Sequence, residues 1–413
     1  MFFIKFIVFS LINISYESYV QYIFKTNHSE EKDSQNYINS IMENKIYIEI
    51  EIGILKQKIP LYIYFNEFPF YIMGSESNIQ FIYNEKKSKS YKTLSNEYIK
   101  FNIYDQNCLG KYSSEIFYFN TGNNSSKKID NFPFYLTKSN KKNLPGLIGL
   151  KIKSYSDSDN FSFIKQLYNY SIISNKVFSI KYLNDSHGEL LIGNFPLLEK
   201  NKDNINYALI EIDGNANLWE LKFDKILFGN EIIPENRLLF FVLELGVIKA
   251  PYIFLSMFEK KFLDKKTCFR ILIDRKYTSF YCNKNFSLEN FPTLFFYNKE
   301  LNYTFELNYK DLFYEKDNIY HLLIYFDFQS EFHWKMGKPF LKKYQLIYDI
   351  DKRAIGFLIN NNNTIYFNYV YFIIIILLLL IIILSIIYFK YLRIKRSKRV
   401  NEIEDEFLYM PQD

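Results

Sequence analysis

Between residues 44 and 360, short apolar runs alternate with clusters of Asn, Gly, Ser and Lys at intervals of 8 to 12 residues. Runs of this length, rich in Ile, Tyr, Phe and Val, are typical of β-strands bounded by turns. Helical periodicity is strongest at Ser162–Tyr168 and Tyr252–Lys260. The pattern predicts an all-β body, whose clearest strands are Ile46–Ile52, Leu61–Tyr64, Phe178–Leu183, Glu189–Ile192, Leu238–Val242 and Gln345–Ile350.

The strand pattern is interrupted once near its middle. Gly193 closes one series of strands, an Asn- and Lys-rich segment follows at Lys200–Asn206, and a new series opens near Tyr207. We therefore predict two β lobes, at residues 44–205 and 206–360.

The first residues form an apolar run with one lysine, which becomes polar near Ser15–Ser18. This run is too short to span a bilayer and has the pattern of a signal peptide. We assign residues 1–20 to it, with cleavage between Ser15 and Gln21; an amphipathic anchor or a first core strand is the alternative interpretation.

A second apolar run, Val370–Phe389, contains no charged residue and only one polar residue, Ser385. It is long enough to be a transmembrane helix. Six basic residues follow between Lys390 and Arg399, which is the charge excess expected on the cytosolic side. We predict a single-pass type I protein of the secretory pathway or cell surface, with a transmembrane helix at 370–389 and a cytosolic tail at 390–413.

Composition adds little to this picture. An apolar content of 48% and an aromatic content of 20% exclude a disordered chain. The net charge of +6 comes from scattered lysines rather than from a basic patch, so we expect no nucleic-acid partner.

Nine acceptor motifs for N-glycosylation lie beyond the signal peptide, consistent with the secretory topology. They begin at Asn27, Asn123, Asn124, Asn160, Asn169, Asn184, Asn285, Asn302 and Asn362.

The chain has three cysteines. Cys268 and Cys282 are close enough in sequence to close a short disulfide loop in an oxidising compartment. Cys108 is then left over, either as a small buried apolar residue or as a partner in an intermolecular disulfide.

The order of several segments resembles the pepsin family of aspartic proteases over nearly all of residues 44–360. The segments are IYIEIEIG (46–53), LPGLIGL (144–150), FSIKYL (178–183), GELLIG (188–193), WELKFDKILFG (219–229), FPTLFF (291–296) and GKPFLKKYQLIYDIDKRAIGF (337–357). The resemblance implies a bilobal pepsin-like fold, in which each lobe donates one Asp from a DTG or DSG loop. Two adjacent carboxylates that share a proton can activate a water and protonate the scissile amide.

Both acid positions depart from the family pattern. The first falls on Tyr64 or, with a two-residue deletion, on Asn66; the second falls on Glu244, which is one methylene longer than Asp. Glu67 and Glu244 would rebuild an acid pair only if the first loop were reshaped. Tyr104 falls where the family's mobile flap carries a substrate-covering Tyr, so the resemblance implies a substrate-binding role for it.

No other catalytic motif supports an enzyme. The four histidines lack metal-ligand spacing, and there is no GxSxG, HExxH or phosphate-binding loop, so we expect no metal and no cofactor.

Three hypotheses remain. The leading one is a membrane-anchored, catalytically inactive pepsin-like protein that binds an extended peptide or a partner protein. The alternative is an active aspartic endopeptidase that uses Glu244 and a second acid. The third is a surface glycoprotein that uses the fold only as a stable body, which a cleft filled by Tyr64, Phe65 and Phe68 would favour.

Overall fold

The structure is a computed structural model. It describes residues 18–27, 41–65, 70–75, 82–103, 106–122, 125–138, 146–152, 162–196, 198, 205–210, 218–233, 238–262, 267–273, 275–329, 333–358, 380 and 382–393. The chain divides into two compact units, Met1–Leu358 and Ile359–Asp413. The larger unit contains the β body, and the strands and helices below belong to it.

The largest sheet has thirteen strands in the order β11-β26-β25-β9-β10-β1-β2-β3-β8-β4-β7-β6-β5. In chain order they are β1 (Tyr19–Asn27), β2 (Lys45–Ile52), β3 (Gln57–Tyr64), β4 (Phe70–Met73), β5 (Lys92–Ile103), β6 (Gln106–Thr121), β7 (Ser125–Lys138), β8 (Gly146–Gly149), β9 (Val177–Tyr182), β10 (His187–Gly193), β11 (Ile205–Leu209), β25 (Leu346–Asp349) and β26 (Ala354–Leu358). Strands from both halves of the chain therefore share one sheet.

Two smaller sheets are built from the second half alone. The first has nine strands, in the order β12-β15-β24-β16-β23-β18-β22-β21 with β17 paired to β18, and the second has the order β14-β13-β19-β20. Their strands are β12 (Glu220–Lys222), β13 (Lys225–Phe228), β14 (Glu231–Ile233), β15 (Leu238–Phe241), β16 (Ile248–Pro251), β17 (Cys268–Ile273), β18 (Tyr277–Asn283), β19 (Leu294–Asn298), β20 (Tyr303–Leu307), β21 (Phe313–Lys316), β22 (Ile319–Leu322), β23 (Ile324–Asp327) and β24 (His333–Met336).

Helices in this unit are short and few among the described residues. They are α3 (Phe163–Asn169), α5 (Leu255–Phe262), α6 (Tyr309–Leu312) and α7 (Lys338–Lys343), with 3₁₀ turns η1 (Glu85–Lys87), η4 (Tyr252–Phe254) and η5 (Leu288–Asn290). The body is thus mostly β, as the sequence predicts.

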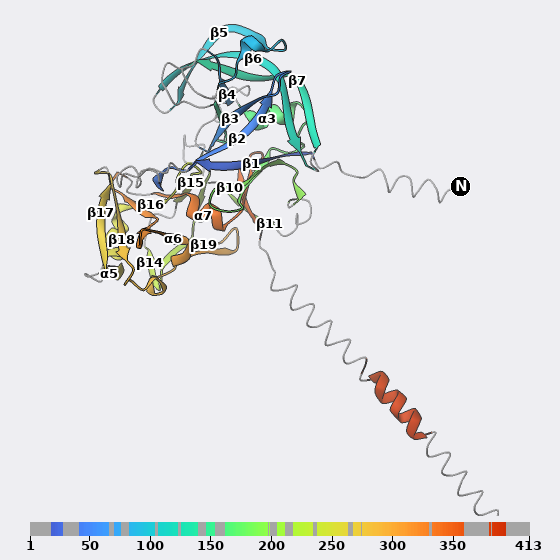
Figure 1. Cartoon of the computed structure of the whole chain (residues 1–413). Coiled ribbons are helices and arrows are strands. Elements are labelled where there is room, and N and C mark those ends of the chain that lie inside the picture. The colour runs from blue at the N-terminus through green and yellow to red at the C-terminus, as the bar shows by residue number, and fades with distance from the viewer. Residues whose placement is uncertain are drawn as a thin grey trace, which may run out of the picture. The chain divides into compact units, whose positions relative to one another are not determined.

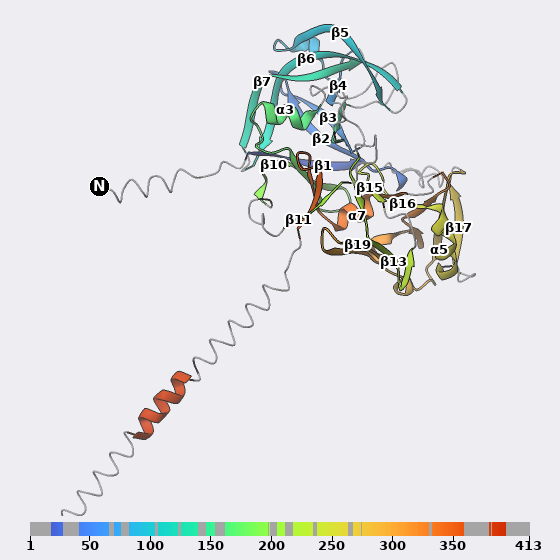
Figure 2. The ribbon, with the colours of Figure 1, turned by 180° about the vertical axis from the view of Figure 1, so that it is seen from behind.

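Two groups of strands lie at opposite ends of this unit (Figures 1 and 2). In both views β5, β6 and β7 lie at one end and β17 and β19 at the other, with β1 and β10 between them. The two halves of the chain are joined in this sheet through β9, which pairs with β10 of the first half on one side and with β25 of the second half on the other. The sheet shared by the two halves therefore passes through the middle of the unit.

Alternation of apolar and polar residues explains the strands near the site. In β2 the isoleucines at 46, 48, 50 and 52 are buried, whereas the residues between them are partly or fully exposed. β3 follows the same rule, with Ile59, Leu61 and Ile63 buried. Period-two burial of this kind places one face of each strand against the core.

Aromatic rings fill much of the core. In the first half, Phe70 packs on Phe163 with ring centroids 4.8 Å apart, and Phe117 packs on Phe132 at 4.9 Å. In the second half, Phe228 stacks on Phe258 at 4.1 Å. Edge-to-face and offset ring pairs of this kind stabilise a core beyond the burial of their area.

The two predicted chain ends fall mostly outside the described residues. The assigned signal peptide covers residues 1–20, of which residues 1–17 are not described, while Tyr19 and Val20 already belong to β1 and pair with Gly193 and Ile192. A cleavage before Tyr19 would leave β1 whole.

At the other end, residues 380 and 382–393 are helical, and residues 370–379 are outside the described part. Among the residues with a described position, no helix is both long and apolar enough to cross a membrane. The transmembrane helix at 370–389 stays a prediction.

Candidate functional site

Each of the two predicted acid loops follows a strand that has a parallel neighbour. β3 ends at Tyr64 and pairs in parallel with β8, and β15 ends at Phe241 and pairs in parallel with β24. Pairing with the parallel neighbour fixes the end of each strand, so the start of each loop has a defined position. The first loop begins at Phe65, and the second runs through residues 242–246.

The loops contact each other through Glu244. The backbone N–H of Phe65 donates a hydrogen bond to Glu244 Oε1 at 2.7 Å. A charge-assisted bond from a backbone amide to a carboxylate is among the stronger hydrogen bonds in proteins. Glu244 therefore joins the first loop to the second across the middle of the unit.

Phe65, which follows the first candidate acid position Tyr64, lies in the core. Its side chain is fully buried, edge-on to Tyr348 at 5.0 Å and to Phe178 at 5.8 Å. Tyr348 in turn stacks on Phe178 at 4.8 Å and lies edge-on to Trp219 at 5.0 Å. The Phe65 ring is thus a core contact between the halves and does not fill a surface groove.

Tyr64 turns to a different part of the core. It is partly buried and packs against a cluster of buried residues that includes Tyr71, Met73 and Tyr135. Because β-strand side chains alternate between faces, Tyr64 and Phe65 contact different clusters. Neither residue supplies an acid.

The second loop is held by its backbone on two sides. Asn44 N–H donates to Glu244 O at 2.8 Å, Gly246 N–H donates to Met42 O at 2.8 Å, and Lys338 N–H donates to Leu245 O at 2.8 Å. A Cβ at position 246 would lie 1.9 Å from the carbonyl oxygen of Ile41, so only glycine fits there. The loop is therefore held by a hydrogen bond from the first residue of α7 and by its contacts with residues 41–44.

Asn44 links this loop to the shared sheet. Its side-chain amide donates to Leu243 O at 2.7 Å and to the hydroxyl of Tyr182 at 2.6 Å. Burial, followed by the charge of Glu244, raises the pKa of Tyr182, although the Asn44 bond acts in the opposite direction. Tyr182 is neutral at physiological pH, so it offers no second ionisable partner for Glu244.

Three other buried acids, Glu115, Asp327 and Asp349, have local structural partners. Glu115 accepts hydrogen bonds from the hydroxyl of Tyr83 and, at 2.8 Å, from Ile116 N–H. Asp327 and Asp349 each accept a backbone N–H two or three residues ahead, from Gln329 and Lys352, both at 2.9 Å. These carboxylates satisfy turns and strand irregularities, as buried polar groups generally must.

The remaining site predictions cannot be placed. Asn66, Glu67 and Phe68 lie outside the described residues, and so does Tyr104, between the end of β5 and the start of β6. Glu244 is therefore the one predicted acid position that the structure describes as an acid. Within the described ranges, no group of three His, Cys, Asp or Glu side chains is arranged to hold a metal ion.

The cysteines and several glycosylation motifs are also described. Cys268 and Cys282 form a disulfide between neighbouring positions of β17 and β18, and Cys108 is free and buried. Asn169, Asn184, Asn285 and Asn302 have exposed side chains, and Asn27 ends β1. Asn123, Asn124, Asn160 and Asn362 lie outside the described residues.

Two contacts of the site were not predicted from the sequence. Phe65 reads as one more aromatic residue in an aromatic-rich strand, and Asn44 as a polar residue that precedes a strand. The proximity of each to residues 243–244 depends on how the halves pack, which local patterns do not encode.

Comparisons with known proteins agree with this geometry. A family model described as eukaryotic aspartyl protease matches residues 66–358. A comparison with curated protein sequences gives no match.

Two solved structures share the fold. Basic 7S globulin from soybean superposes with a TM-score of 0.63 and 12% identity, covering 83% of this chain and 95% of the globulin. Conglutin gamma, described as a unique basic 7S globulin from lupine seeds, gives a TM-score of 0.64 and 12% identity with the same coverage. At this identity the similarity extends to the fold alone.

Proposed function

Because the chain belongs to the eukaryotic aspartyl protease family, we propose that it is a catalytically inactive member that binds an extended peptide or a partner protein. We further propose that it is a single-pass type I membrane glycoprotein of the secretory pathway or cell surface. The pepsin-like body would then lie in the lumen or outside the cell.

The bond between Glu244 and Phe65 carries the proposal of inactivity. Peptide hydrolysis by this family's mechanism needs two carboxylates that share a proton. Here one carboxylate oxygen of Glu244 accepts the backbone N–H of Phe65 at 2.7 Å. The described start of the opposite loop, Tyr64 and Phe65, supplies two aromatic side chains. Glu244 thus serves as a structural acceptor between the halves.

Loss of the acids leaves the means of binding a peptide in place. Extended peptides are recognised largely through backbone hydrogen bonds and side-chain pockets, which need no catalytic group. The second loop already forms such bonds within the chain, since Glu43 and Leu245 make an antiparallel bridge beside the bond from Gly246 N–H to Met42 O. These bonds between the loop backbone and a neighbouring segment support recognition of extended peptides.

Proteolysis and binding can be measured on the same preparation. We expect the full-length chain, purified in detergent, to leave reduced casein intact at acid pH, with no difference between wild type and Glu244→Ala. Fluorescence anisotropy of labelled casein peptides should show saturable binding. Acid-dependent cleavage that Glu244→Ala abolishes would instead establish an active endopeptidase. Absence of both cleavage and peptide binding would favour a glycoprotein that uses the fold only as a stable body.

Topology can be examined separately in cells. We expect the chain to resist extraction by alkaline carbonate and to lose apparent mass on endoglycosidase treatment. Its tail, 390–413, should be cleaved by protease added to the cytosolic side of intact microsomes. Extraction by carbonate together with an unchanged mass would contradict the membrane and glycoprotein assignments.

A further inference from the structure

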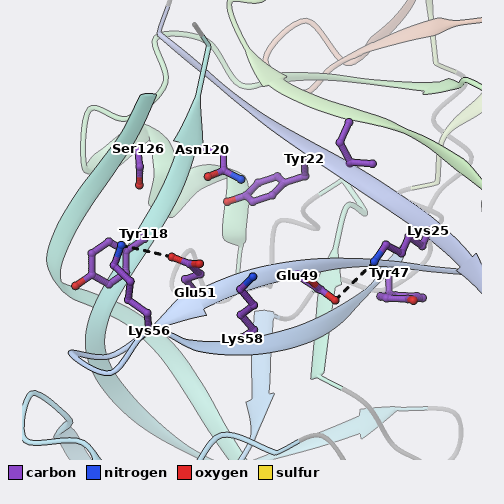
Figure 3. A pocket seen from close by; sticks show the side chains of 11 residues that line it. Tyr22, Lys25, Tyr47, Glu49, Glu51, Lys56, Lys58, Tyr118, Asn120 and Ser126 are labelled. Carbon is purple, nitrogen blue, oxygen red and sulfur yellow. Dashed lines mark ion pairs between the residues drawn. The ribbon is translucent and has the colours of Figure 1, made fainter. Parts of the chain in front are cut away.

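A pocket of about 340 Å³ lies where three strands of the thirteen-stranded sheet pair with one another only over short stretches. β1 pairs with β2 at residues 25–27, β1 pairs with β6 only at Val20, and β2 pairs with β6 at Glu51 and Ile52. The strands diverge between these corners and frame a three-sided opening (Figure 3). No residue of the loops at 64–65 or 243–246 lines it.

One side chain at this opening lacks a hydrogen-bond partner. The hydroxyl of Tyr22 is buried and has no partner among the described residues, and the whole residue is 2% exposed. Figure 3 shows this hydroxyl directed into the space between Asn120 and the side chains of Glu51 and Lys58. Buried polar groups are nearly always satisfied in native proteins, so this hydroxyl points to a missing partner in the pocket.

Of the three lysines around the opening, one makes no ion pair with a described residue. Lys25 pairs with Glu49 at 3.9 Å, and Lys56 pairs with Glu51 at 3.7 Å. Lys58 lies opposite Glu51 in the β2–β3 register, and among the described residues it makes no ion pair. Two of the three lysines are thus neutralised, and the pocket as a whole carries a charge that suits one anionic group.

The remaining lining groups suit hydroxyls and a ring. Asn120 and Ser126 offer neutral donors and acceptors, and Tyr47 adds an aromatic wall. Hydroxyl and amide groups beside an aromatic surface can bond sugar hydroxyls while covering the apolar face of the sugar ring.

We propose that this pocket binds a small anionic sugar, a monosaccharide that carries one carboxylate or one phosphate group. The anionic group bonds to Lys58, and a hydroxyl of the sugar supplies the partner that Tyr22 lacks. The site is formed by β1, β2, β3, β6 and β7, so it operates whether or not the acid loops bind a peptide.

Calorimetric titration of the full-length chain in detergent tests the proposal. The probes are glucuronic acid and glucose 6-phosphate, with glucose and inorganic phosphate as matched controls. We expect saturable binding of at least one of the two acids, and binding at least about tenfold weaker for both controls, because each control lacks one half of the recognised chemistry. Failure of both acids to bind, or equal binding of glucose or phosphate, would overturn the proposal.

Variants assign the binding to these residues. Lys58→Met should weaken binding about tenfold, Lys58→Arg should retain it, and Tyr22→Phe should weaken it several-fold without lowering the melting temperature. Lys225→Met, at an exposed lysine of β13 outside the pocket, is the control and should change nothing. Unchanged affinity in Lys58→Met would overturn the assignment, and the Lys58→Arg variant shows whether a loss reflects charge or misfolding.

Discussion

Glu244 shows how an acid in a protease fold can take on a structural role. Its extra methylene lets one carboxylate oxygen reach Phe65 N–H at 2.7 Å, and its own carbonyl accepts a bond from Asn44 N–H at 2.8 Å. Phe65 is then held with its ring among Phe178 and Tyr348. We therefore expect Glu244 to contribute to the stability of the fold rather than to catalysis.

Replacing Glu244 should destabilise the fold in graded steps. In Glu244→Ala the amide of Phe65 loses its acceptor, which costs about 1–3 kcal/mol, whereas Glu244→Gln keeps a neutral acceptor and loses about half as much. Denaturant unfolding of both variants measures the difference. Glu289→Ala, at an exposed acid, is the control and should stay within about 0.5 kcal/mol of wild type. Equal stability of all three variants would contradict a structural role for Glu244.

Lys338 is a partly buried cation at the start of α7. Burial lowers its pKa to about 8, while Asp185 opposes the shift and Lys342 adds to it. Its ammonium donates to the carbonyl of Asp185 at 2.7 Å. The protonated form is therefore less favourable in the folded chain than in the unfolded chain.

Stability should rise between pH 8 and about 10 because of Lys338. An ordinary lysine, as in the unfolded chain, has a pKa of about 10.4. Between the two pKa values the unfolded chain binds a proton that the folded chain has released, so the free energy of unfolding increases with pH by up to about 3 kcal/mol. Unfolding curves across this interval measure the slope. Lys338→Met should flatten it, and Lys249→Met should leave the Lys338 share in place. A slope unchanged in Lys338→Met would show that other groups cause it.

At the scale of elements, the alternation of apolar and polar residues is sufficient to predict a strand that has one buried face. The predicted strands at 46–52, 178–183 and 189–192 agree within one or two residues with β2, β9 and β10, and the one predicted at 61–64 covers the second half of β3. The long hairpin strands β5, β6 and β7 are not among the predicted strands; β5 is largely exposed on both faces and β7 ends in a continuous buried run, so neither shows alternation. Pairing between distant segments, such as β1 with β10, has no local signal at all.

The candidate site was predictable only in part. The absence of DTG and DSG motifs identified what the loops lack, and this follows from residue identity alone. The bond between Phe65 and Glu244 could not be predicted, because the two residues are far apart in sequence and meet only through packing of the halves. The pocket beside Tyr22 was missed for the same reason, since three separate strands frame it.

The disulfide of the second half joins neighbouring strands and should add measurable stability. Cys268 and Cys282 face each other in the β17–β18 register and close a short loop. On the chain-entropy account a loop of this size contributes about 3 kcal/mol. Thermal or denaturant unfolding with and without a reducing agent measures it.

Two cysteine variants serve as controls for that measurement. A chain with Cys268→Ala and Cys282→Ala should show the lower stability and no further response to reduction. Cys108→Ala should keep the full response, because Cys108 is free. A reducing agent that destabilises the double variant equally would contradict the assignment.

At the scale of the whole molecule, the two halves share a sheet and a set of buried contacts. Trp219 Nε1–H donates to Leu150 O at 2.8 Å, and β9 pairs with both β10 and β25. These contacts cross from the first half of the chain to the second. We expect contacts of this kind to couple the unfolding of the two halves.

Residues 18–358 should therefore unfold in one transition. Trp334 is buried within the second half and Trp219 at the contact between the halves, so their fluorescence reports the second half and that contact, whereas far-ultraviolet circular dichroism reports all strands. We expect both signals to change at the same denaturant concentration. Separate midpoints would show that the halves unfold independently and that the shared sheet couples them weakly.

The position of β1 has a consequence for biosynthesis. Tyr19 and Ile23 find their partners only at Gly193 and Glu189, and the sheet that contains them is completed only by β26, which ends at Leu358. Most of β1 must wait without its β10 partner until residue 193 has left the ribosome, with Tyr22 and Phe24 accessible meanwhile. Molecular chaperones should accordingly engage this nascent segment early and release it only after translation passes residue 193.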